Sequence, residues 1–215
     1  MTIDDLADFT VQHGLMDRLV LGELGKQAVE DLRVYFADYT GRRFERFDGG
    51  GDSHGVADRI TSSDVLAVSM LSITWSPEAV IRLIEKSHDE MSPLLADIPH
   101  TPIEEVDLEA LSQGSAAYRL WGALRQIKGI GPVTASKLLA RKRPHLVPIF
   151  DRVVRIALSF PPSANFWRCQ WEWFHGSAER AAGLRSLRAQ VDGIESISLV
   201  RCLDVAVWMH GKRGS

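Results

Sequence analysis

Lys128-Gly129-Ile130-Gly131-Pro132 is the stretch of this sequence that decides the fold we expect. It separates two segments with the apolar spacing of amphipathic helices, Tyr118–Ile127 and Val133–Ala140. Two glycines two positions apart permit a tight turn and let the backbone approach a ligand closely. Pro132 suits the first position of the second helix, so the N–H groups of that helix point out of the turn. We therefore predict a hairpin of two helices over residues 118–141, suited to binding phosphate.

Helical spacing also dominates the rest of the chain, and strand-like alternation is nearly absent. An amphipathic segment runs from Glu23 to Tyr39, Thr61-Ser-Ser-Asp64 reads as a capping box, and Ser76-Pro77-Glu78 starts a further helix. Other helices are expected at 115–127, 132–141, 151–158, 163–175, 177–190 and 196–210. The sequence therefore predicts an all-α fold, a two-lobed helical bundle.

The chain of 215 residues is long enough for one large domain built from two packed lobes. The proline-interrupted segment Met91–Pro102 is the expected join between an N-terminal lobe of about residues 1–100 and a lobe of about 101–215 that carries the hairpin. Arg143–Pro148 should be extended, because each proline disfavours helix in the residue before it. The glycine-rich segment 49–55, flanked by Asp48 and Asp58, does not match a calcium loop and reads as a flexible surface loop.

The charge of the chain is unevenly distributed. The formal net charge is −3, yet the segment from Arg119 to Arg155 holds nine basic residues and one acid, Asp151, and so carries +8. Clustering of this kind predicts a positive surface that attracts a polyanion. A solvated basic helix face is the alternative that charge alone leaves open.

The sequence begins MTIDDLADFT, without a basic and apolar export signal, and no apolar stretch approaches the roughly 20 residues of a membrane span. Two cysteines, Cys169 and Cys202, are too few for a disulfide framework. We expect a cytoplasmic, monomeric protein with no membrane association.

Gly129-Ile-Gly-Pro-Val-Thr-Ala135, followed by Val147-Pro-Ile-Phe-Asp151, resembles the signature of the helix-hairpin-helix (HhH-GPD) superfamily of base-excision DNA glycosylases. The spacing of 18 residues between Val133 and Asp151 is close to the spacing in that signature. The similarity covers residues 118–158, and the chain resembles a divergent, uncharacterised bacterial branch of this superfamily. It implies a DNA-glycosylase-like fold and double-stranded DNA as the partner.

The resemblance also implies roles for single residues. Asp151 would be the catalytic carboxylate. Contacts to DNA would come from Lys128, Gly129, Ile130, Gly131, Val133, Thr134, Lys137 and Arg152. A monovalent cation in the hairpin would be held by the backbone carbonyls of Arg125, Ile127 and Ile130. Bifunctional relatives carry a lysine nucleophile where this chain has Val133, and the cysteine cluster of iron–sulfur relatives is absent, so we expect a monofunctional enzyme that requires no cofactor.

A carboxylate suits this chemistry, because breaking an N-glycosidic bond develops positive charge on the sugar. Asp151 is also a favoured helix N-cap, and capping alone is the competing interpretation. Tyr118 and Trp121 precede the hairpin and are the candidate lining of a pocket for the flipped base. The aromatic residues between Phe166 and Phe174 have the helical spacing of core residues.

Three functions remain open. The first is a monofunctional DNA glycosylase acting on a damaged or modified base, in DNA repair or in defence against foreign DNA. The second is a non-catalytic helix-hairpin-helix DNA-binding protein, and the third is a helical protein whose hairpin serves packing or partner binding. The sequence does not identify the base.

Overall fold

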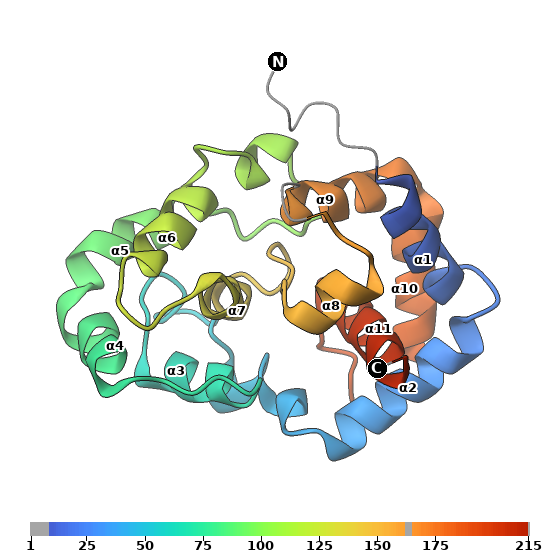
Figure 1. Ribbon diagram of the computed structural model, residues 1–215, viewed down its shortest axis with the longest axis horizontal. Coiled ribbons are helices and arrows are strands. Elements are labelled where there is room, and N and C mark those ends of the chain that lie inside the picture. Colours follow the sequence, from blue (N-terminus) through green and yellow to red (C-terminus); the bar gives the residue numbers. More distant parts are fainter. Residues whose placement is uncertain (1–8, 162–164, 215) are drawn as a thin grey trace. The chain divides into compact units, whose positions relative to one another are not determined.

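The computed structural model describes residues 9–161 and 165–214, and within these ranges every regular element is a helix (Figure 1). The predicted all-α fold class is therefore confirmed for the described residues. The chain divides into two compact units, of which unit 1 comprises Met1–Asp38 and Phe150–Ser215 and unit 2 comprises Tyr39–Ile149. This division differs from the expected lobes of about 1–100 and 101–215, because the N-terminal helices group with the C-terminal ones.

Unit 1 is organised around its C-terminal helix. Its helices are α1 (Thr10–Val20), α2 (Gly25–Asp38), α8 (Arg152–Ala157), α9 (Phe166–Gly176), α10 (Ala178–Ala189) and α11 (Leu199–Arg213). Residues 199–207 of α11 are all buried, so this helix needs neighbours on every side. It packs against α1, α2, α8 and α10. A Cβ at Gly211 would lie 2.9 Å from that of Ala157, so glycine permits the close approach of α11 and α8.

Unit 2 is organised around α7. Its helices are η2 (Thr40–Arg43), η3 (Phe47–Gly49), α3 (Ser62–Ser69), α4 (Pro77–Ile81), η4 (Arg82–Lys86), α5 (His88–Ala96), η5 (Leu108–Leu111), α6 (Ala116–Arg125) and α7 (Pro132–Lys142). Every residue from Thr134 to Lys142 is buried, with α3 and α6 packed on α7 and α5 packed on α6. The prediction that Met91–Pro102 joins two lobes is wrong, because α5 includes Pro93 and the whole segment lies within unit 2.

The helix starts predicted at Thr61 and Ser76 from capping residues are confirmed, whereas the helix expected at 196–210 begins at Leu199 after the cap Ser198. Thr61 and Asp64 form a reciprocal capping box at α3, and the Ser76 hydroxyl accepts the N–H of Ala79 at 3.2 Å. Ser163, where a helix was expected to begin, lies outside the described residues, and α9 begins after Asn165. The segment after α7 is less extended than predicted, because the N–H groups of Leu146 and Val147 both donate to the carbonyl of Arg143 in a turn.

The glycine-rich segment is packed at Gly50 and Gly51, which corrects the expectation of a flexible surface loop for this part, whereas Gly49, His54 and Gly55 are exposed. Gly50 and Gly51 are buried. A Cβ at Gly51 would lie 2.4 Å from the carbonyl oxygen of Arg141 and 2.8 Å from Oδ1 of Asp64. Glycine is required here because any side chain would separate the loop from α7.

In the described ranges, no helix has both the length and the apolar character needed to cross a membrane.

Candidate functional site

The turn between α6 and α7 brings together most of the residues that the sequence singles out. α6 begins at the cap Ser115, whose hydroxyl accepts the N–H of Tyr118 at 3.2 Å. Within the turn, the N–H of Ile130 donates to the carbonyl of Ile127 at 3.0 Å, and the Ile130 side chain is buried. Lys128, Gly129, Gly131 and Pro132 are exposed. A buried isoleucine therefore anchors a turn whose other residues face solvent.

The two glycines of the turn have different roles. Gly129 has φ +92°, a conformation that favours glycine, and a Cβ there would lie 3.0 Å from Oγ of Ser76. Gly131 has φ −86° and ψ 176°, which any residue adopts, and a Cβ there would meet nothing within 4 Å. The expectation that the turn needs glycine at position 131 is therefore wrong, and position 129 carries that requirement.

The N-terminus of α7 opens at this exposed turn. Gly131 is its N-cap and supplies no side-chain cap, and Pro132 occupies the first turn. The first intrahelical bond runs from the N–H of Ala135 to the carbonyl of Gly131 at 3.0 Å, so the N–H groups of Val133 and Thr134 precede the regular ladder. Such groups and the positive end of the helix dipole suit an anion.

Lys137 does not belong to this surface. Its side chain is 6% exposed, and Nζ donates to the carbonyl of Leu71 at 2.9 Å. The amine thus serves packing between α7 and the segment after α3. The sequence-based assignment of Lys137 as a phosphate contact is corrected accordingly.

Three further cations of the basic segment, Arg141, Lys142 and Arg143, are also buried. Arg141 Nε and Lys142 Nζ bind the two carboxylate oxygens of Asp64 at 3.1 Å and 2.9 Å. Arg143 binds Asp58 at 2.7 Å, and the three cations also donate to the backbone carbonyls of Phe44, Glu45, Phe47, Val56, Ala57, Leu95 and Ile98. Burial lowers the pKa of Lys142, while the Asp64 carboxylate acts in the opposite direction.

These contacts remove part of the positive charge of the +8 segment from the surface. Four of its nine cations hold unit 2 together, so the predicted positive surface is much weaker than the sequence suggests. The exposed cations of this basic segment that lie in unit 2 are Arg119, Arg125 and Lys128. Arg119 lies 3.6 Å from the carboxylate of Asp97.

The aromatic residues of α6 lie beside the start of α7. Trp121 and Tyr118 meet edge to face with ring centroids 6.1 Å apart, and both are half-buried. The indole N–H of Trp121 donates to the carbonyl of Pro132 at 3.3 Å, and the guanidinium of Arg125 lies 4.3 Å from the centroid of the Trp121 ring.

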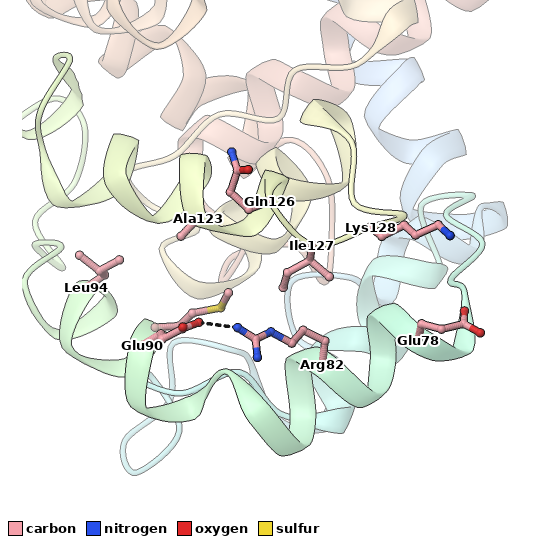
Figure 2. Close-up of a pocket in the computed structure, with 9 residues that line it drawn as sticks. Glu78, Arg82, Glu90, Leu94, Ala123, Gln126, Ile127 and Lys128 are labelled. Atoms are coloured by element: carbon pink, nitrogen blue, oxygen red, sulfur yellow. Dashed lines mark hydrogen bonds and ion pairs between the residues drawn. The ribbon is translucent and has the colours of Figure 1, made fainter.

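A groove of about 630 Å³ in unit 2 also reaches this turn. Met91, Leu94, Ala123 and Ile127 give it an apolar lining. Figure 2 shows Lys128 and Glu78 at one end and Leu94 at the other, with the ion pair between Arg82 and Glu90 at 3.0 Å along one wall. Neither Tyr118 nor Trp121 is among its lining residues, so their role as a base pocket stays a prediction.

Asp151 belongs to unit 1 and is half-buried. It is the N-cap of α8, where Oδ1 accepts the N–H of Val154 at 3.0 Å. Capping was the competing interpretation of this residue, and the geometry confirms the cap. The neighbouring Arg152 is exposed.

A buried polar network of unit 1 was missed by the sequence reasoning. Arg201 of α11 donates to Asp204 and to the hydroxyl of Tyr35 in α2. Burial raises the pKa of Tyr35, and the negative charges of Asp204 and Asp151 raise it further, against the lowering effect of Arg201. The network therefore forms part of the electrostatic surroundings of Asp151. Its only sequence signal is an Arg–Asp pair three residues apart in an otherwise apolar helix.

The carbonyl groups expected to hold a monovalent cation lie at the end of α6 and in the turn. Helix-terminal carbonyls lack intrahelical donors, and such oxygens suit a hard monovalent cation. The carbonyl of Ile127 accepts the N–H of Ile130 and keeps a second lone pair. The donor set of Arg125, Ile127 and Ile130 thus fits the expected ion chemically.

Within the described ranges, no group of three or more His, Cys, Asp or Glu side chains has the arrangement of a metal site. His54, His88 and His100 line a second pocket of about 540 Å³ with Asp52 and Asp58. Cys169 and Cys202 are both buried and form no disulfide, and burial raises the pKa of Cys169.

Comparison with protein families shows that this chain belongs to a family of unknown function (DUF6308), whose model matches residues 28–211. No curated protein and no solved structure matches the chain.

Proposed function

We propose that this protein binds double-stranded DNA through the α6–α7 turn, in the manner of the helix-hairpin-helix superfamily that the sequence resembles. The observation that carries the proposal is the start of α7. It has no side-chain cap, lies at an exposed turn beside Lys128, and follows a glycine with φ +92°. Uncapped N–H groups at an exposed helix start bind a backbone phosphate without reading the bases.

We further propose that the protein is a monofunctional DNA glycosylase with Asp151 as its catalytic carboxylate. The bond between C1′ of the sugar and the base nitrogen breaks, leaving positive charge on the sugar and the electron pair on the base. A carboxylate stabilises that charge and orients a water molecule. The water oxygen adds to C1′, its proton leaves to solvent or to the base, and the products are the free base and an abasic site.

Replacing Asp151 tests the catalytic role. In Asp151→Asn the amide can still cap α8, so folding should be retained, while base release should fall by at least a hundredfold. Release would be measured by chromatography on duplexes that carry damaged or modified bases. The control is Asp192→Asn, which changes an exposed carboxylate of unit 1 and should leave excision unchanged.

Borohydride reduction during the reaction tests the monofunctional assignment. Val133 offers no amine, and Lys137 is buried and bound to the carbonyl of Leu71, so no protein–DNA adduct should form. Strand breaks should appear only after alkali. An adduct abolished by Lys128→Arg would show that the exposed lysine of the turn attacks the sugar, and the monofunctional assignment would then fail.

A non-catalytic DNA-binding protein is the second candidate. The cap of Val154 by Asp151 accounts for an aspartate at this position without any chemistry. Salt-dependent DNA binding with no base release from any duplex tested would favour this candidate.

A further inference from the structure

We propose that Arg125 is a preorganised phosphate contact of the DNA-binding surface and that Trp121 is the positioning residue that holds it. This inference rests on the proposed DNA binding. It adds a role for the side chain of Arg125, for which the sequence predicted only a role of the backbone carbonyl.

The geometry fixes the side chain of Arg125 in two steps. The indole N–H of Trp121 donates to the carbonyl of Pro132 at 3.3 Å, which holds the ring against the start of α7. The guanidinium of Arg125, one turn later on α6, then lies 4.3 Å from the ring centroid. A guanidinium stacked on an aromatic ring in this way keeps its N–H edge available to a second partner.

Arg125 differs from two other exposed arginines of unit 2, Arg82 and Arg119, in having no charge partner within the described ranges. Arg82 pairs with Glu90 at 3.0 Å, and Arg119 lies 3.6 Å from Asp97. Among the residues that the structure describes, no carboxylate pairs with Arg125. Its positive charge therefore stays uncompensated beside the exposed turn.

An uncompensated, oriented guanidinium beside a helix N-terminus suits a phosphate group. Arginine binds phosphate through two parallel N–H···O bonds, and it loses less side-chain freedom on binding when its position is already fixed. Lys128 adds a second exposed cation three residues further along the chain. Because Lys137 and the three cations at the end of α7 are buried, Arg125 and Lys128 are the unpaired exposed cations of the basic segment in unit 2.

The experiment measures the affinity for a fluorescent 20-base-pair duplex by anisotropy across a salt series. Arg125→Ala should weaken binding about tenfold at 0.1 M salt and reduce the slope of log K against log salt by about 0.9, the value for one phosphate contact. Arg125→Lys should keep the slope and lose several-fold in affinity, because lysine lacks the planar fork. Arg119→Ala is the matched control, since its guanidinium lies beside Asp97, and its binding should equal that of the parent.

The positioning role of Trp121 has its own test. Trp121→Leu keeps every charge, so the salt slope should stay unchanged while affinity falls several-fold. In the double variant with Arg125→Ala, the leucine should cost nothing further, because the side chain that it no longer holds is already absent. A purely structural role would instead lower the melting temperature and give additive losses.

Four results would overturn the inference. If the parent binds duplex DNA and Arg125→Ala binds equally well, the proposed function survives and the role of Arg125 fails. If Arg119→Ala lowers the slope as much as Arg125→Ala does, the effect is general charge loss. If Arg125→Ala weakens binding to single strands only, with an unchanged slope, the guanidinium stacks on bases. Absence of any salt-dependent binding by the parent would reject the proposed function itself, and this inference with it.

Discussion

Asp64→Asn should destabilise unit 2 strongly, because one buried carboxylate neutralises two buried cations. The side chains of Asp64, Arg141 and Lys142 are each 1% exposed, with nitrogen–oxygen distances of 3.1 Å and 2.9 Å. Removing one partner of a buried ion pair costs about 3–5 kcal/mol, because the other charge stays in a medium of low polarity. Asparagine keeps the size of the side chain and can still accept the N–H of Thr61. The loss of stability therefore measures mainly the removal of the negative charge.

Urea unfolding and thermal melting measure this loss. For a chain of this length, each kcal/mol shifts the melting temperature by about 2–4 °C, so a decrease of about 6–20 °C is expected. Glu90→Gln is the control, because its pair with Arg82 is exposed and should contribute less than about 1 kcal/mol. A loss below about 1 kcal/mol for Asp64→Asn would refute the assignment of these cations to the interior.

Further predictions concern the turn, Lys137 and the cysteines. Gly131→Ser should stabilise the protein by roughly a few tenths of a kcal/mol, because it supplies the missing side-chain cap of α7. It should also weaken duplex binding, because its hydroxyl occupies the N–H groups proposed to bind phosphate, and a variant with parental DNA affinity would contradict that proposal. Gly129→Ala, at φ +92°, should instead cost about 1–2 kcal/mol by urea unfolding, and parental stability would be inconsistent with a left-handed turn. Lys137→Met should cost about 1–3 kcal/mol by leaving a carbonyl unpaired, with an unchanged salt slope of DNA binding; a reduced slope would return this lysine to the surface. A thiol reagent at pH 8 should label Cys169 only in denaturant, since burial raises its pKa and excludes the reagent, and rapid labelling of the native protein would contradict this packing.

The features that the sequence predicts well are local. The capping box of Thr61 and Asp64, the start at Ser76 and the cap at Asp151 each depend on a side chain and a backbone N–H a few residues away. Spacing and residue type therefore suffice to predict them.

The errors share a different physical cause. Lys137, Arg141, Lys142 and Arg143 have the sequence appearance of a basic surface, yet many of their partners are backbone carbonyls from distant segments. A carbonyl has no sequence signature, so a buried cation satisfied by carbonyls cannot be distinguished from an exposed one by composition. The same limit applies to the segment 49–55, where Gly51 packs against Arg141.

The burial of these cations also limits the electrostatic contribution to the proposed DNA binding. If all nine cations of the basic segment met phosphates, affinity would fall about 10⁵-fold between 50 and 200 mM salt, at about 0.9 counterions released per contact. Only five lie outside the interior, namely Arg119, Arg125, Lys128, Arg152 and Arg155. Five contacts give a slope of at most about −4.5 and a loss of about 500-fold over the same range. A measured slope near −8 would require cations beyond these five to reach DNA, either those at the end of α7 or exposed ones outside the basic segment. A slope of about −4.5 or shallower would agree with the burial of four of the nine cations, whose charge then serves the fold and does not contribute to the binding of a polyanion.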